Sequence, residues 1–154
     1  MPNYSKYISY KAAWDRIKDC NHHGYYIESI SICESIISDR LLSLSLSIPQ
    51  KESLSERTSL HELIKHCKVI SKKLDTLNSL GGVQILEEAN NWRKLRNETI
   101  HGLAKSLPGK PTKDPRVFFA AAKYSAEEGT KLARAICRWH KKLKLISPKV
   151  DQNE

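Results

Sequence analysis

Apolar residues recur at steps of three and four along most of the chain, which is the spacing of an amphipathic helix. The clearest run has its apolar positions at Tyr26, Ile30, Cys33, Ile37, Leu41 and Leu44. An earlier helix is predicted from near Lys6 to Cys20, and the segment NHHG with Gly24 ends it. The segment LSLSLSIP alternates as a strand does, but the chain offers no second strand to pair with it. We therefore interpret it as the end of the second helix, stopped by Pro49.

Polar and glycine-rich breaks separate the next two helices. Ser59 and Glu62 form a capping-box pattern that opens a third helix running toward Lys73. The pair Gly81 and Gly82 interrupts the chain before a fourth helix. The inward positions predicted for this fourth helix are Ile85, Ala89, Trp92, Leu95 and Ile100.

The last third of the chain begins with LPGKPTKDPRV, whose prolines and glycine predict a surface loop. A final helix is expected from about Val117 past Trp139 into a basic tail at about 141–154. A length of 154 residues supports one hydrophobic core, so we expect a single domain covering residues 1–154. The predicted fold class is all-α, an antiparallel bundle of four or five helices.

The composition limits the classes of partner. A formal net charge of +9 and a pI near 9.4 attract polyanions, which in a cell are nucleic acids and anionic membranes. No stretch of eighteen apolar residues predicts a membrane span, and the start of the chain does not resemble a signal peptide, so we expect a soluble cytoplasmic protein. Widely spaced cysteines without a C-x-x-C pair are interpreted as reduced core residues, and we expect neither a metal nor a cofactor. These cysteines are Cys20, Cys33, Cys67 and Cys137.

Arginine followed by histidine after a spacer of four to six residues occurs three times in the sequence. The pairs are Arg96 with His101, Arg16 with His22 or His23, and Arg134 with His140. Only Arg96 is followed directly by a polar amide, Asn97. For this composition, chance predicts an Arg–Asn pair with a histidine at the tightest spacing about 0.014 times per chain. The stretch RNETIH is therefore the candidate reactive site.

On a regular helix, the three residues of this candidate site do not all lie on one face. Asn97 and His101 share one face of a helix, whereas Arg96 and His101 lie about 140° apart. Either the helix turns near Gly102, or a second subunit brings its own copy of the three residues across an interface. In the alternative interpretation, Arg96 and His101 are cations favoured near a helix C-terminus, Gly102 ends the helix, and Asn97 is a solvated amide.

RNETIH, at Arg96, Asn97 and His101, resembles the signature of the HEPN superfamily, whose helical bundles occur in prokaryotic toxins, antiviral systems and some eukaryotic ribonucleases. The upstream ESIISDRL, from Glu34 to Leu41, is similar to the acidic helix that precedes this signature in several HEPN groups. The sequence departs from the nucleotidyltransferase-partnered toxins of the family. Those proteins carry a tyrosine shortly after the histidine, where this chain has Gly102 and Leu103.

The resemblance implies a metal-independent endoribonuclease that cleaves RNA by attack of the ribose 2′-OH, as a prokaryotic toxin or antiviral defence effector. His101 suits acid-base chemistry near neutral pH, Arg96 suits phosphate binding, and Asn97 would orient the phosphate or the histidine. The expected partners are RNA, a second copy of the chain that forms a composite active site, and an antitoxin or regulatory protein. Some HEPN domains are inactive, so the alternative is a module that binds a nucleotide, a nucleic acid or a protein.

Other residues are candidates for supporting roles. Glu34 and Asp39 are predicted either to form a solvated face or to position a site residue. Further contacts with nucleic acid are expected at Arg93, Lys94, Lys105 and Arg134. The basic segment KLARAICRWHKKLKLISPK fits an RNA-backbone stripe, an amphipathic membrane helix or an ordinary solvated face. We favour RNA because the apolar residues of this segment have the spacing of core positions, which leaves only the charges outside.

Overall fold

In the computed structural model, the described residues form α-helices and no strand. The residues that the structure describes are 3–48, 53–74, 77, 79–102, 108–112 and 114–146. The principal helices are α1 (Tyr4–His23), α2 (Tyr26–Leu46), α3 (Leu60–Lys73), α5 (Gly82–His101) and α6 (Pro115–Ile146). The prediction of an all-α bundle is therefore confirmed.

The predicted helix boundaries follow local chemistry. Gly24 ends α1 with a φ of 79°, a left-handed conformation that glycine adopts at little cost. The capping box at the start of α3 is present, with Ser59 and Glu62 each satisfying the other's backbone N–H. α2 continues through the alternating serine and leucine segment to Leu46, so this segment is helical as predicted. Pro49, the proposed stop, lies outside the described residues.

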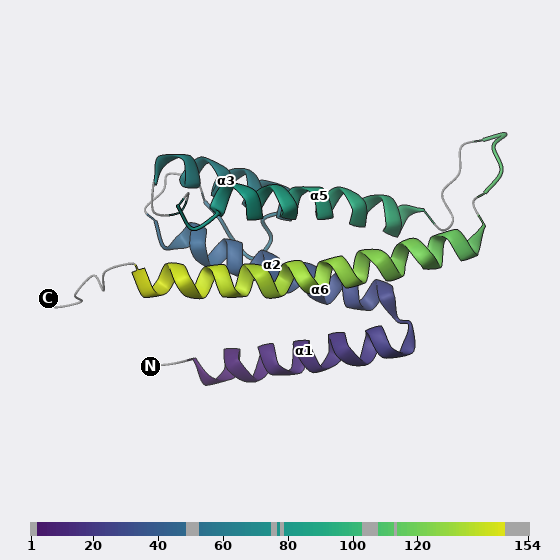
Figure 1. Cartoon of the computed structure of the whole chain (residues 1–154), viewed down its shortest axis with the longest axis horizontal. Helices are drawn as coiled ribbons and strands as arrows, with labels where there is room; N and C mark the ends of the chain where they lie inside the picture. The colour runs from purple at the N-terminus through teal and green to yellow at the C-terminus, as the bar shows by residue number, and fades with distance from the viewer. Residues whose placement is uncertain are drawn as a thin grey trace, which may run out of the picture.

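The helices lie in three tiers (Figure 1), with α3 and α5 above, α2 and α6 in the middle and α1 below. α6 makes its most extensive contacts with α2 and α5, while α1 packs mainly on α2 and only lightly on α6. α6 begins at Pro115, two residues before the predicted start, and contacts α2, α5 and, more lightly, α1, while α3 packs on α2 and α5. The largest fully buried side chains of the hydrophobic core are Ile17, Ile30, Ile37, Leu41, Leu63, Ile64, Leu86 and Ile136.

α5 and α6 approach closely where a tryptophan meets a glycine. The buried Trp92 indole donates a hydrogen bond of 2.9 Å from Nε1 to the backbone oxygen of Ser125. A Cβ atom added at Gly129 would lie 2.6 Å from Trp92 Cζ2 and 2.9 Å from its Nε1. Gly129 therefore makes room for the indole, which its hydrogen bond holds in place.

Gly129→Ala is expected to lower the free energy of unfolding by about 1–3 kcal/mol, the usual cost of overpacking a core. Helix propensity alone predicts the opposite sign, a gain of about 1 kcal/mol. Urea denaturation of the variant measures the difference. As a control, adding Gly129→Ala to a Trp92→Leu protein should cost much less, and an equal cost in both backgrounds would contradict the steric explanation.

Candidate functional site

The last two turns of α5 carry the predicted Arg96, Asn97 and His101. The inward face of this helix is marked by its buried residues Leu86, Ala89, Trp92 and Thr99. Arg96 follows Trp92 by four residues and precedes Thr99 by three, so it falls on the same inward face. A permanently charged side chain thus occupies a position that the helical pattern reserves for the core.

Glu34 of α2 pairs with Arg96, because the guanidinium Nη2 donates a hydrogen bond to Glu34 Oε1. The two side chains are 17% and 29% exposed, respectively. The Nε atom of Arg96 is buried and has no hydrogen-bond partner in the described part of the chain. Partial burial makes such a pair costly to desolvate, so its main effect is to fix the position of the arginine rather than to add stability.

Asn97 is half-buried and His101 is exposed. Neither side chain forms a hydrogen bond or ion pair with another described residue. α5 remains helical through His101, and Gly102 keeps right-handed values of φ −80° and ψ −22°. Within the described residues, therefore, no turn brings His101 round to the side of Arg96. One copy of the chain presents the two residues on different faces of α5.

Asp39, the second predicted supporting residue, is held in a separate cluster. Lys6 Nζ lies 2.9 Å from Asp39 Oδ1, and the Tyr10 hydroxyl donates to Oδ2 at 2.5 Å. The Arg40 guanidinium lies over the Tyr10 ring, 4.1 Å from its centroid. Partial burial acts to raise the pKa of Asp39, but the bonds from Tyr10 and Lys6 lower it overall. Asp39 thus joins α1 to α2, whereas Glu34 contacts the candidate site.

His140 lies near this cluster and was not singled out by the sequence analysis as a functional residue. It is 6% exposed, and its Nε2 lies 3.2 Å from Ser43 Oγ. Burial, followed by the charges of Arg40 and Lys144, lowers the pKa of His140 to about 4. The helical spacing from Ile136 was the available signal that this histidine faces inward. Ser43 comes from a distant part of the chain and gave no such signal.

The remaining predicted nucleic-acid contacts have different surroundings. Arg93 is half-buried and donates to Asn90 Oδ1 of its own helix at 3.2 Å. Lys94 is exposed. Arg134 is exposed and lies over the Trp14 ring, 5.7 Å from its centroid. Lys105 lies outside the described residues.

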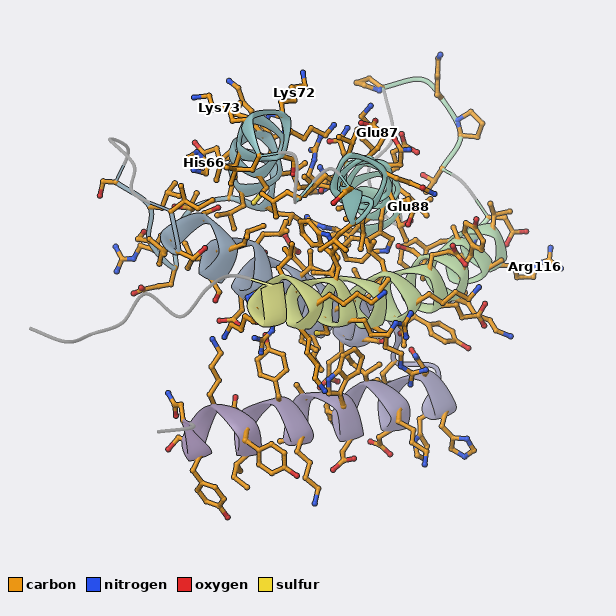
Figure 2. All side chains as sticks on the ribbon, turned by 60° about the vertical axis from the view of Figure 1, so that its left-hand side comes forward. His66, Lys72, Lys73, Glu87, Glu88 and Arg116 are labelled. Carbon is orange, nitrogen blue, oxygen red and sulfur yellow. The ribbon has the colours of Figure 1, made fainter. Side chains whose placement is uncertain are left out.

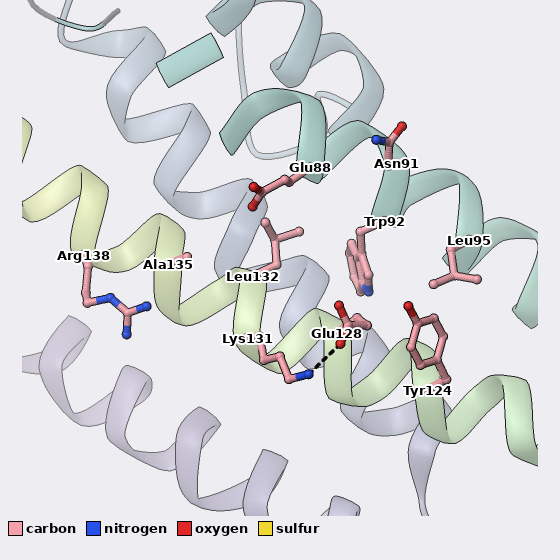
Figure 3. A pocket seen from close by; sticks show the side chains of 10 residues that line it. All are labelled: Glu88, Asn91, Trp92, Leu95, Tyr124, Glu128, Lys131, Leu132, Ala135 and Arg138. Atoms are coloured by element: carbon pink, nitrogen blue, oxygen red, sulfur yellow. Dashed lines mark hydrogen bonds and ion pairs between the residues drawn. The ribbon is translucent and has the colours of Figure 1, made fainter. Parts of the chain in front are cut away.

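An open pocket of about 520 Å³ lies between α5 and α6 (Figure 3). Trp92, Leu95 and Leu132 form its apolar wall, and the half-exposed Tyr124 closes one end. An ion pair of 2.7 Å between Glu128 and Lys131 lies on its rim. The other lining residues are Glu88, Asn91, Ala135 and Arg138. The sequence pattern gave no signal for this pocket, because its shape depends on how the side chains of two neighbouring helices pack against each other.

The two competing Arg–His pairs are less suited to chemistry. The Arg16 guanidinium is engaged by Glu28 at 2.8 Å and by Asp19 at 3.1 Å. In the Arg134 pair, His140 is buried and bonded to Ser43. Arg16 is thus held by two carboxylates and the histidine of the Arg134 pair is buried, whereas Arg96 has one carboxylate partner and His101 is exposed.

The cysteines are free thiols, and Cys20, Cys33 and Cys67 are buried as predicted, whereas Cys137 is half-buried. Among the described residues, no three His, Cys, Asp or Glu side chains gather as a metal site would require. None of the described helices has the length and apolar character needed to cross a membrane.

Comparisons of the chain with protein-family models, curated proteins and solved structures gave no match. Function is therefore argued from the residues of this chain.

Proposed function

We propose that this protein is a metal-independent endoribonuclease of HEPN type, acting as a prokaryotic toxin or antiviral defence effector. The observation that carries the proposal is the end of α5, where Glu34 fixes Arg96 and His101 is exposed five residues later. A fixed guanidinium is suited to a phosphate because its donors are oriented before the substrate arrives. An exposed histidine is accessible to the ribose and can exchange protons with it.

The reaction requires a base and an acid. One histidine takes the proton of the ribose 2′-OH as that oxygen forms a bond to phosphorus. The bond from phosphorus to the 5′ oxygen breaks, and the same histidine returns its proton to the leaving oxygen. The arginine stabilises the extra negative charge of the pentavalent transition state. The products are a 2′,3′-cyclic phosphate and a 5′-hydroxyl.

A second copy of the chain supplies the missing groups in this proposal. One copy has Arg96 and His101 on different faces of α5, so it cannot direct both side chains at one phosphate. A twofold axis near the end of α5 would place the Arg96 of one copy beside the His101 of the other. The expected assembly is therefore a homodimer with a composite site. An antitoxin or regulatory protein would act by covering that end of α5.

The second candidate function is an inactive HEPN module that binds a nucleotide, a nucleic acid or a protein. The ion pair between Arg96 and Glu34 favours it, because an arginine already neutralised by a carboxylate has less attraction for a phosphate. In this module the pair would serve to join α5 to α2. The two functions differ in whether RNA is cut.

Cleavage of total RNA by the purified protein is expected to persist in EDTA and to leave 2′,3′-cyclic phosphate or 3′-phosphate ends. The reason is that the proposed reaction uses the 2′-OH and side chains alone, so chelation removes nothing it needs. End-labelling of the products measures the chemistry. A DNA of the same sequence should stay intact because it lacks the 2′-OH. Products with 3′-hydroxyl ends, or loss of cleavage in EDTA, would show that the mechanism is wrong.

A further inference from the structure

The second half of α6 has two opposite faces. Its apolar residues Leu132, Ile136, Trp139 and Leu143 are all buried, each at most 7% exposed. Basic residues occupy the opposite side, within about 100° of the helix circumference. We call this exposed set the cationic stripe, and its members are Lys131, Arg134, Arg138, Lys141 and Lys142. The sequence contains no Asp or Glu between residues 129 and 146, so no carboxylate of this helix segment lies among them.

Most of the cationic stripe is not neutralised. Lys131 pairs with Glu128 at 2.7 Å, and Arg134 lies over Trp14. Arg138, Lys141 and Lys142 form no ion pair with any carboxylate among the described residues. Like charges three and four residues apart slightly destabilise a helix, so folding gains nothing from this arrangement. Their grouping instead favours a polyanion, whose phosphates can each meet a cation.

An aromatic side chain extends the same ridge of α6. Tyr124 is 55% exposed and stands seven residues before Lys131, which itself stands seven before Arg138. Steps of seven place the three side chains in one line along a helix. Figure 3 shows Tyr124 and Arg138 at opposite ends of the pocket between α5 and α6. A row of cations beside an exposed ring is the pattern on which single-stranded nucleic acids track their backbone and stack a base.

We propose that the cationic stripe binds the phosphate backbone of single-stranded RNA, as a surface separate from the Arg96 and His101 motif. Phe118 of α6 lies beside the end of the motif, because a Cβ atom added at Gly102, the residue after His101, would lie 4.0 Å from the Phe118 ring. Arg138 follows Phe118 by twenty residues, which is roughly 30 Å of helix. The stripe therefore grips RNA several nucleotides away from the motif. As a substrate surface it rests on the proposed function, but binding itself requires no cleavage.

A membrane surface fits this half of α6 less well. Amphipathic helices that lie in a bilayer insert an apolar face between the lipids. Here the apolar residues of the basic segment are buried against the rest of the bundle, and the face left outside is cationic. Lipid binding would have to be electrostatic alone, and it becomes an outcome of the test.

The test compares two triple variants of the full chain by fluorescence anisotropy. The probe is a labelled, unstructured 20-nucleotide RNA with 2′-O-methyl groups, which cannot be cut through the 2′-OH. Arg138→Gln/Lys141→Gln/Lys142→Gln removes three charges of the stripe. The control, Lys65→Gln/Lys72→Gln/Lys73→Gln, removes three exposed charges from α3, where Lys72 and Lys73 point away from the bundle (Figure 2). Both proteins should keep the parent's melting temperature, because all six residues are exposed.

The stripe variant is expected to bind the RNA about tenfold or more weakly than the parent in moderate salt. The slope of log K against log salt should become shallower by about 2, since each phosphate contact to a single strand contributes about 0.7. The α3 variant should stay within about twofold of the parent. If both variants lose RNA affinity equally, binding depends on the net charge of the protein and not on the stripe, and the proposal is overturned. Unchanged RNA binding with lost binding to phosphatidylserine vesicles would overturn it in favour of a membrane.

Cleavage assays separate this proposal from the proposed function. The stripe variant should lose kcat/KM on a 20-nucleotide RNA but keep it on a dinucleotide, which is too short to reach from the motif to the stripe. A parent protein that cuts no RNA, while the stripe variant still loses binding, would leave the stripe standing and remove the ribonuclease. If the parent cuts RNA and the stripe variant binds RNA as tightly as the parent, the ribonuclease proposal stands and the stripe proposal is wrong.

Discussion

Arg96→Ala and His101→Ala are each expected to cut RNA at least about a hundredfold more slowly than the parent protein. Removing a contact that stabilises a transition-state charge costs about 3–4 kcal/mol of activation free energy, which gives this factor. Asn97→Ala should lie between them and the parent, because orienting a neighbour contributes less than supplying charge or a proton. Rates are measured on one labelled RNA with all proteins at the same concentration.

The controls exclude loss of the fold. Arg16→Ala removes an exposed arginine whose partners are Glu28 and Asp19, and it should keep nearly the parent rate. Arg96→Ala leaves Glu34 without its partner, so its melting temperature should fall, and rates are compared where circular dichroism shows each protein folded. A folded His101→Ala protein that cuts as fast as the parent would refute the catalytic role and favour the inactive module.

Mixing the two inactive variants tests the composite site within the same experiment. If each site takes Arg96 from one copy and His101 from the other, a mixed dimer contains one intact site and one doubly defective site. Random exchange of equal amounts places half of the molecules in mixed dimers, so about a quarter of the parent activity should return. A mixture as inactive as its components would indicate that both residues of a site come from one chain.

Sequence reasoning predicted the helices well because their signals are local. Gly24 and the capping box of Ser59 with Glu62 each act within one turn of chain, and the structure places helix ends at both. The apolar residues of the basic segment were predicted to belong to the core, and Leu132, Ile136, Trp139 and Leu143 are indeed buried. The helical spacing was sufficient to predict their burial, because these residues all lie on one face of the helix.

The surroundings of the candidate site depended on contacts between distant segments. Glu34 and Asp39 are five residues apart on the same helix, and sequence patterns could not tell which one meets Arg96. The structure assigns Glu34 to Arg96 and joins Asp39 to Lys6 and Tyr10. The inward placement of Arg96 was readable from its spacing to Ala89 and Trp92. Its charge, however, argued for the surface, and only the partner on α2 resolves that conflict.

Acid is expected to destabilise the protein through His140 as the pH falls from about 6.5 to 4. Unfolded, this histidine has an ordinary pKa of 6.5, whereas burial holds its pKa at about 4 in the folded state. Between these values the unfolded chain binds a proton that the folded one does not, so stability falls as pH falls. The slope approaches about 1.4 kcal/mol per pH unit, and the total loss by pH 4 is about 3 kcal/mol. Urea denaturation from pH 7.5 to 4.5 measures it.

His140→Gln is the matched control, because an amide can keep a hydrogen bond to Ser43 and carries no titrating proton in this range. Asp39 contributes to the pH dependence only at more acid pH. Its lowered pKa stabilises the folded state above its ordinary value of 3.8, and this stability is lost as the pH falls below that value. Above pH 4.5, therefore, the change in stability reports on His140 and not on Asp39. The glutamine variant should show a much flatter stability profile from pH 6.5 to 4.5. A parent profile that is equally flat would mean that His140 is protonated in the folded protein, and that Arg40 and Lys144 do not oppose its charge as their positions imply.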